Sequence, residues 1–152
     1  MHTLFARHEP TLAAALKAAQ ERAYWSAYPE VPSGKIYGET ATDDGLSSYN
    51  ARLGTPFDLP GHPATVTVGT EVSPFGPPLG ITYPAVDAIT LIEASRAAAP
   101  AWAAASAETR VGICLEILAR LNRISFEMAN AVMHTTGQAF AMALLGGAPD
   151  CR

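Results

Sequence analysis

The sequence has 152 residues, and 10 Lys and Arg against 14 Asp and Glu give it a net charge of −4 at pH 7. This is the length of one ordinary domain. The absence of a basic run or stripe argues against binding to nucleic acid or to an anionic membrane. Alanine supplies much of the 49% hydrophobic content, so few large side chains are available to fill a core.

Two features predict a cytoplasmic protein. Cys114 and Cys151 are too few and too far apart to form the disulfide framework of a secreted scaffold. The N-terminal stretch "MHTLFARHEP" lacks the pattern of a signal peptide, and the longest uncharged apolar run, "AFAMALLGGA", is too short to span a bilayer. We therefore expect a soluble chain with no membrane partner.

The first predicted element is a helix over about residues 9–24, with apolar residues at helical intervals. Pro10 fits its first turn, so residues 3–8 are expected to form a separate turn or a kinked lead-in. The stretch "SAYPEVPSGKIYGET" then predicts an ordered loop. Its aromatic side chains and those just before it are expected to pack on a neighbouring element, and an aromatic ligand platform is the alternative: Tyr24, Trp25, Tyr28 and Tyr37.

The middle of the chain is irregular. "DDGLSSYNARLG" predicts a short helix closed by Gly54, and "ATVTVGTEV", residues 64–72, is the one credible strand. In "FGPPLG" a structural turn is favoured over a phosphate cradle, because neither GxGxxG nor GxxxxGK[ST] is present.

The last part of the chain predicts three helices. The first covers about residues 86–99, is ended or kinked by Pro100, and has Trp102 packed beside its exit. The second covers 107–123 with Ser106 as its N-cap, and the third covers 125–136 with Gly137 as its C-cap. The fold class predicted is thus mainly α, with at most one or two short strands.

No residue of this chain is assigned a catalytic, cofactor-binding or metal-binding role. His2, His8, His62 and His134 have no metal-ligand spacing with one another or with the cysteines. Cys114 lies in an aliphatic helical stripe with Val111, Leu118 and Leu121, which predicts a buried, protonated core thiol. Cys151, beside Arg152, could have a lowered pKa, but a frayed terminus cannot hold it in fixed geometry.

Residues 85–145 resemble the N-terminal helical portion of the α/β aldehyde dehydrogenase fold. In that family an alanine-rich helix ends in a corner with Ala-Trp, a Ser-capped helix with an early Arg follows, and the next helix ends in Thr-Gly-Lys/Gln. The corresponding marks here are Pro100-Ala101-Trp102, Ser106 to Arg110, and Thr136-Gly137-Gln138. The resemblance extends from about residue 3 to about residue 147.

Residues 1–84 are similar to the N-terminal extension of the phenylacetic acid degradation (ring-opening) branch of the superfamily. The stretches that carry this similarity are "RAYWSAYPEVPSGKIYGE" and "GTEVSPFGPPLGITYP". Beyond the extension, "VMHTTGQAF", residues 132–140, is also similar to that branch. The predicted organisation is a family-specific extension over 1–84, a helical segment over 85–145 and a disordered tail over 146–152.

The resemblance implies an oxidoreductase that uses NAD(P), in which a cysteine thiolate attacks an aldehyde and water releases the acid. The family's nucleophilic Cys, general-base Glu, oxyanion-binding Asn and glycine-rich cofactor turn lie downstream of the segment that this sequence resembles. We therefore expect an N-terminal fragment that binds no cofactor and has no catalytic activity alone. "HTTGQ", residues 134–138, is then a landmark of the scaffold.

Two alternatives stay open at this point. A free-standing helical module could pair with itself or with a full-length homologue through the apolar surface that the rest of the fold would cover. A non-functional product of a truncated gene is the other alternative, and the departure of "GGAPDCR" from helix-like sequence is consistent with a frameshifted end. The aldehyde substrate, the choice of NAD or NADP, the oligomeric state and the origin of the truncation are not determined by the sequence.

Overall fold

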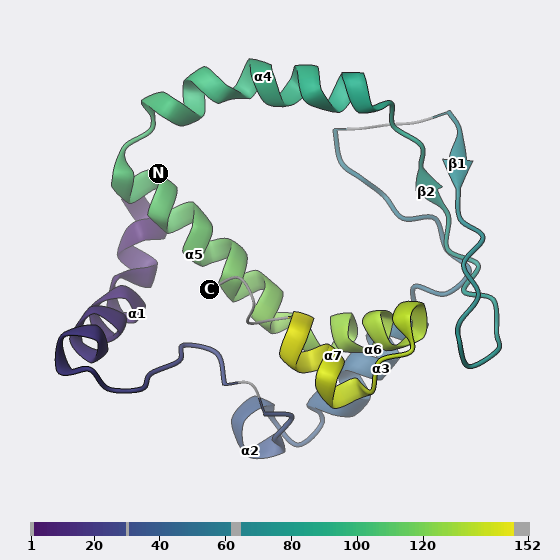
Figure 1. Ribbon diagram of the computed structural model, residues 1–152, viewed down its shortest axis with the longest axis horizontal. Helices are drawn as coiled ribbons and strands as arrows, with labels where there is room; N and C mark the ends of the chain where they lie inside the picture. The colour runs from purple at the N-terminus through teal and green to yellow at the C-terminus, as the bar shows by residue number, and fades with distance from the viewer. Residues whose placement is uncertain (1, 30, 62–64, 148–152) are drawn as a thin grey trace.

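The computed structural model describes residues 2–29, 31–61 and 65–147 and is mainly helical (Figure 1), which confirms the predicted fold class. In chain order the elements are α1 His2–Glu21, α2 Gly34–Tyr37, α3 Ala41–Asn50, β1 Thr67–Val68, β2 Tyr83–Pro84, α4 Ala88–Ala104, α5 Ala107–Arg123, α6 Ser125–Thr136 and α7 Phe140–Gly147. No helix among the described residues is long and apolar enough to cross a membrane.

The two helices with the clearest caps begin and end as predicted. The Ser106 hydroxyl accepts a hydrogen bond from the Thr109 backbone N–H and starts α5 at residue 107. Gly137 ends α6 in the left-handed conformation (φ 78°), and its N–H donates to the Met133 carbonyl. Local hydrogen bonding by Ser and the freedom of Gly to adopt positive φ set both boundaries.

Neither proline is a helix boundary, so the predicted separate turn before Pro10 and the predicted end at Pro100 are wrong. Pro10 lies inside α1, so residues 3–8 belong to the same helix, and Pro100 lies inside α4, which continues to Ala104. Each proline removes one backbone hydrogen bond, and the alanine-rich sequence on both sides of Pro100 keeps enough helix propensity to continue past it.

Helix α7 was not predicted, and it includes Gly146 and Gly147, which the sequence analysis assigned to a disordered tail. Residues 148–152 of that predicted tail lie outside the described part of the chain. The loop predicted after the first helix contains the single helical turn α2.

Of the predicted strand 64–72, residue 64 lies outside the described residues, and within 65–72 the strand is β1 alone, which pairs antiparallel with β2 in the register Thr67↔Pro84 and Val68↔Tyr83. Gly69 has φ 150°, and a Cβ there would lie 2.1 Å from the Ile81 carbonyl oxygen, so the two chain segments approach closely where the ribbon ends. Beyond it, the Gly76 N–H donates to the Ser73 carbonyl and the Ser73 N–H donates to the Pro77 carbonyl. The segment "FGPPLG" is therefore a structural turn, as predicted.

The helices pack in two separate groups (Figure 1). One is formed by α1 and α5, and the other by α3, α6 and α7, with α5 leading from the first group to the second. The apolar core lies in the second group and consists of Phe126, Ala129, Ala143 and Leu144. In Figure 1, α4 runs alone along one edge, between the β ribbon and the start of α5.

The molecule exposes far more surface than a compact monomer does. A folded chain of this mass has an accessible surface of about 7,400 Å², whereas this one exposes 10365 Å². The excess, roughly 3,000 Å², agrees with the open arrangement of the helices and with the small apolar core.

Gly45 is predicted to control the packing of α3 against α6. A Cβ at this position would lie 2.4 Å from the Phe126 Cβ, so Gly45→Ala forces the two helices apart. We expect a loss of about 1–3 kcal/mol in the free energy of unfolding. At a helix position with free space around it, Gly→Ala increases stability instead, so a loss would report the close contact. Urea unfolding followed by circular dichroism measures this, and Ser47→Ala on the exposed face of α3 is the control. Equal stability of the Gly45→Ala variant and the wild type would contradict the close contact.

Candidate functional site

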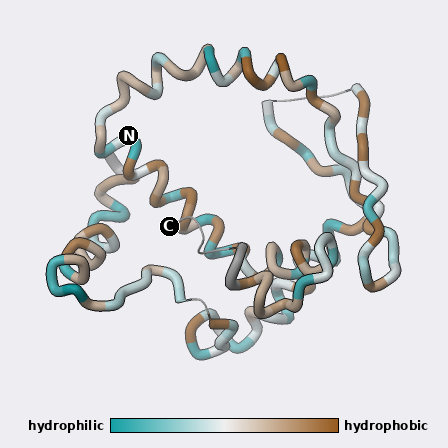
Figure 2. Tube along the Cα trace, in the orientation of Figure 1, coloured by the Kyte–Doolittle hydropathy of each residue, from teal (hydrophilic) through white to brown (hydrophobic). Residues whose placement is uncertain are grey.

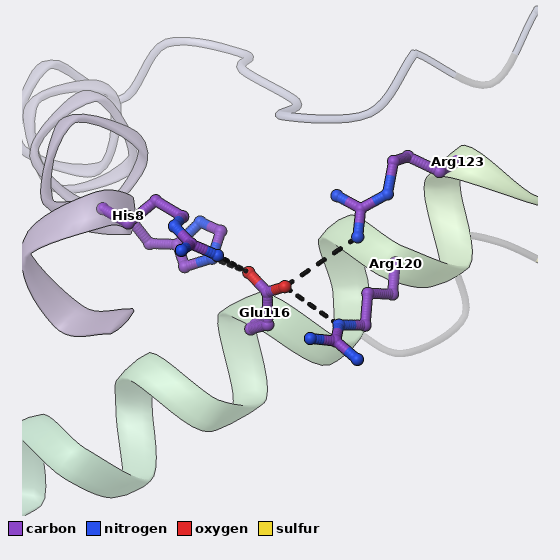
Figure 3. Close-up of polar contacts among 5 residues, drawn as sticks. His8, Glu116, Arg120 and Arg123 are labelled. Carbon is purple, nitrogen blue, oxygen red and sulfur yellow. Dashed lines mark hydrogen bonds and ion pairs between the residues drawn. The ribbon is translucent and has the colours of Figure 1, made fainter. Parts of the chain in front are cut away.

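The most highly charged cluster joins α1 to α5 and centres on Glu116 (Figure 3), which is only 6% exposed. Its Oε2 lies 2.8 Å from the His8 Nε2 and 3.2 Å from the Arg7 guanidinium. Its Oε1 lies 2.9 Å from the Arg120 Nε and 3.8 Å from the Arg123 guanidinium. One carboxylate therefore connects a residue pair on α1 with two turns of α5.

Hydrogen bonds from Arg120 and His8, with a further contribution from Arg7, lower the pKa of Glu116 to about 2 against the opposing effect of burial. The carboxylate is thus ionised at neutral pH, with both oxygens occupied by donors. Three hydrogen bonds from two helices converge on it, so its role is to fix α1 on α5. Next to this cluster, Gly112 allows the backbone of Phe5 to approach, since a Cβ there would lie 2.6 Å from the Phe5 nitrogen.

Glu116 was not among the candidate residues predicted from the sequence. The available signal was an acidic residue with Arg120 four and Arg123 seven residues later, on the same face of the helix. Which residue of α1 would meet it could not be read from spacing, because His8 is 108 positions away in the chain.

A second polar contact lies at the end of α6, within "HTTGQ". The His134 Nδ1 is 2.9 Å from the Ser73 hydroxyl, and the imidazole stacks on the Tyr49 ring at a centroid distance of 4.9 Å. The Phe75 ring meets the other side of His134 edge-on at 5.6 Å. Ser73 is only 3% exposed and also accepts the Phe75 N–H, so its hydroxyl is not a free nucleophile. The cluster attaches the turn after β1 to α6.

An open groove with a volume of about 420 Å³ lies beside Tyr49. Its lining includes Phe57 and Tyr83, whose rings are 5.9 Å apart, together with Ile81 and Met128. Burial raises the pKa of Tyr49, and its hydroxyl has no hydrogen-bond partner within the described residues. The lining also includes the charged residues Arg52, Asp58 and Glu127, of which Arg52 and Glu127 form an ion pair at 2.9 Å.

Cys114 is exposed, which corrects the prediction of a buried core thiol. The side of α5 that faces α1 is the one with Gly112 and Glu116. In the predicted aliphatic stripe, Val111 is 36% exposed, and Leu118 and Leu121 are half-buried. Within the described residues no histidine or carboxylate is hydrogen-bonded to the Cys114 sulfur, so nothing there activates the thiol. Cys151 lies outside the described residues.

The histidines are not brought together. His8 lies at the α1–α5 contact and His134 at the end of α6, while the side chain of His2 and all of His62 are outside what the structure describes. In the described part of the chain no group of three His, Cys, Asp or Glu side chains could hold a metal ion.

The predicted packing of loop aromatics holds only in part. Tyr37 packs edge-on against Phe126, with ring centroids 5.2 Å apart, and Tyr28 is half-buried. Tyr24 is 85% exposed and Trp25 39% exposed, and Trp102, expected beside the exit of α4, is 46% exposed. These three large side chains have too little of the chain around them to be covered.

The strand-to-helix junction between β2 and α4 does not have the properties of a dinucleotide site. The connecting residues are Ala85, Val86 and Asp87, and the Asp87 carboxylate accepts the Thr90 N–H at 3.1 Å. Phosphate groups bind at such a helix start through free backbone N–H groups and glycines that allow close approach. A carboxylate in that position repels them, so this junction does not fit NAD(P).

The chain has the fold of a fragment of an aldehyde dehydrogenase. It superposes with a TM-score of 0.85 and 50% sequence identity on the crystal structure of an NAD-dependent aldehyde dehydrogenase from Burkholderia multivorans. The match covers 96% of this chain and 26% of that chain, so this chain spans about a quarter of the length of its relative. No protein-family model matches the sequence, and no curated protein matches it.

The Glu116 cluster makes the stability of the chain pH-dependent. Because the pKa of Glu116 is lowered to about 2 in the folded state, its contribution is present above the usual carboxyl pKa, about 4.3, and is lost as the pH falls from there toward 2. Glu116→Gln is therefore expected to lower the midpoint of thermal unfolding at pH 7, with a difference from wild type that shrinks toward pH 2. The control is Glu9→Gln, an exposed residue of α1. A pH-independent difference would contradict the ionised cluster.

Cys114 is predicted to react in the folded chain. In a Cys151→Ser background, which leaves a single thiol, a chromogenic disulfide reagent should label Cys114 at a rate within about tenfold of the denatured chain. Exposure of Cys114 is the physical reason. If the labelling rate of Cys114 under native conditions were several orders of magnitude lower than in the denatured chain, the face of α5 that contains Cys114 would be buried and the prediction would be wrong.

Proposed function

We propose that this chain is the scaffold segment of an NAD(P)-dependent aldehyde dehydrogenase and that it has no dehydrogenase activity by itself. The observation that carries the proposal is the 50% identity with an NAD-dependent aldehyde dehydrogenase over 96% of this chain. Identity at that level, with a TM-score of 0.85, supports descent from the same fold and a shared role in it.

The arrangement of the described residues supports a scaffolding role. Aldehyde oxidation requires an activated thiolate, a base for water, oxyanion donors and a bound nicotinamide in fixed geometry. Cys114 has no base beside it, Glu116 is occupied by cations, and the start of α4 presents a carboxylate. The buried polar groups connect helices to one another and do not converge on a substrate.

We further propose that the parent enzyme acts in the breakdown of phenylacetate, on an aldehyde released by ring opening. The support is the similarity of "RAYWSAYPEVPSGKIYGE", "GTEVSPFGPPLGITYP" and "VMHTTGQAF" to that branch of the superfamily. These stretches form the loop after α1, the turn after β1 and the end of α6. The turn after β1 and the end of α6 are in contact through the Ser73–His134 hydrogen bond. Two of the three stretches that are similar to this branch therefore contact each other in the fold.

The first test uses the 152-residue chain alone. Isothermal titration should detect no binding of NAD or NADP, and mixtures with several aliphatic and aromatic aldehydes should show no rise in absorbance from reduced cofactor. The physical reason is the loss of a whole catalytic constellation, which removes many orders of magnitude in rate. Turnover that disappears in Cys114→Ala would contradict the proposal by placing a catalytic thiol in this chain.

The second test asks whether the segment can serve in a dehydrogenase. Residues 2–147 replace the matched quarter of the Burkholderia multivorans enzyme, and the chimera is assayed for NAD-dependent aldehyde oxidation. We expect the chimera to retain activity within about tenfold of the parent enzyme. A segment that displaced the catalytic groups by about 1 Å would lower the rate by about 100-fold, so the assay distinguishes the two outcomes. A chimera that folds and forms the parent's oligomer but has no activity would refute the scaffold role.

A further inference from the structure

The groove beside Tyr49 has one wall that hydrogen bonds between two chain segments hold in place. The Phe57 N–H donates to the Thr82 carbonyl at 2.7 Å, and the Gly54 N–H donates to the Leu79 carbonyl at 2.9 Å. Residues of α3 and α6 form the rest of the lining. A volume of about 420 Å³ is within the range of small-molecule sites, about 300–1,000 Å³. The groove is therefore a pre-formed space of the size of a small ligand.

Two aromatic rings lie side by side in this groove. The centroids of the Phe57 and Tyr83 rings are 5.9 Å apart, and the ring planes are inclined at 42°. Phe57 is 49% exposed and Tyr83 is half-buried, so solvent reaches both residues. The face of an aromatic ring is the negative end of its quadrupole and attracts a cation within about 6 Å. The pair therefore offers accessible aromatic surface to a positively charged group.

The lining also has one negative charge without a partner. Figure 2 shows hydrophobic and hydrophilic residues mixed along the segment that leads from α3 to the β ribbon. The charges of Arg52 and Glu127 cancel in their ion pair at 2.9 Å. Asp58 directly follows Phe57, and within the described residues no ion pair or hydrogen bond involves its carboxylate. The lining is thus negative overall and repels anions.

Tyr49 does not change this charge. It is only 3% exposed, and burial raises the pKa of its hydroxyl above the usual value, so the side chain is neutral at neutral pH. The Asp58 carboxylate, next to the aromatic pair, therefore determines the sign of the ligand that the groove attracts.

A metal ion is a poor match to this arrangement. Metal sites need several carboxylate, imidazole or thiolate ligands, and in the described part of the chain no group of three such side chains occurs. An organic ammonium ion needs one carboxylate to balance its charge, aromatic faces beside the cation, and apolar surface for its carbon body. Ile81 and Met128 supply that apolar surface in the same groove.

We propose that the groove beside Tyr49 binds a small organic ammonium ion with an aromatic or alkyl body. The cationic group lies beside the Asp58 carboxylate and on the rings of Phe57 and Tyr83. A neutral aromatic molecule would use the apolar surface but would gain nothing from Asp58. The proposal goes beyond the proposed function and does not depend on it, because the groove has no part in aldehyde oxidation.

The test is a ligand-observed NMR titration of the 152-residue chain with benzyltrimethylammonium, whose charge is permanent, at constant ionic strength. Saturable binding is expected with a Kd of about 1 mM, as is usual for a ligand of this size. Benzyl alcohol presents the same ring without the charge and should bind at least about threefold more weakly. Benzoate, with the opposite charge, should bind more weakly still.

Two variants separate the carboxylate from the aromatic surface. Asp58→Asn should weaken the binding of benzyltrimethylammonium by about threefold to fivefold and leave that of benzyl alcohol unchanged. Phe57→Leu keeps apolar volume but removes an aromatic face, and should weaken the binding of the cation by about threefold or more. The matched control is Asp43→Asn, the same change at an exposed residue of α3 outside the groove, which should leave both affinities unchanged.

Both groove variants change exposed residues, so each should retain the helical circular dichroism of the wild type. Three results would each overturn the proposal: no saturable binding of benzyltrimethylammonium up to about 20 mM, binding of benzyl alcohol as tight as that of the cation, or an unchanged affinity for the cation in either groove variant. None of these results bears on the activity of the dehydrogenase chimera, so the two proposals fail separately.

Discussion

The contact between α1 and α5 through Glu116 holds the first part of this chain in place. Gly112 lets the backbones of the two helices meet, and the carboxylate then binds His8 and Arg7 on one side and Arg120 on the other. The apolar core of the molecule lies elsewhere, between α3, α6 and α7. Without the Glu116 cluster, α1 would have few large side chains to keep it on α5, because Leu16 is exposed and the alanines contribute little area.

A buried ion pair is an uncertain source of stability, since removing charges from water costs much of what their attraction returns. Its more reliable effect is on specificity. Apolar alanine surfaces can slide against each other with little change in energy, whereas a carboxylate that must meet one histidine and two arginines fits a single register. The Ser73–His134 contact has the same function at the other end, where it fixes an irregular proline-rich turn on α6. Polar contacts thus determine the arrangement in a chain that is poor in bulky residues.

The sequence was informative where the determinant is local. Ser106 and Gly137 set the bounds of α5 and α6 through their own hydrogen bonds and backbone angles, so both helices could be placed from the sequence. Burial is different, because it depends on what lies opposite. The aliphatic stripe with Cys114 has the spacing of a core face, but in this chain the element opposite α5 is α1, and α1 lies against Gly112 and Glu116.

The errors at Cys114, Trp102 and Tyr24 therefore have one physical cause. Each side chain is of a kind that proteins usually cover, and each is exposed because no described element packs over it. The resemblance to the aldehyde dehydrogenase fold could be inferred from short motifs, because each motif is local in the sequence and does not depend on what lies opposite it in space. The burial pattern, in contrast, could be known only from the coordinates of the segment itself.

The composition of α4 reconciles two requirements that otherwise conflict. A helix made of leucine and isoleucine would pack tightly in a larger fold but would expose an aggregation-prone patch until it was covered. A helix of polar residues would be soluble alone but would bury unsatisfied groups after docking. Eight of the 17 residues of α4 are alanines, which expose little area each, and its large exposed apolar side chains are limited to Ile89, Leu91 and Ile92 in the first turns and Trp102 near the end.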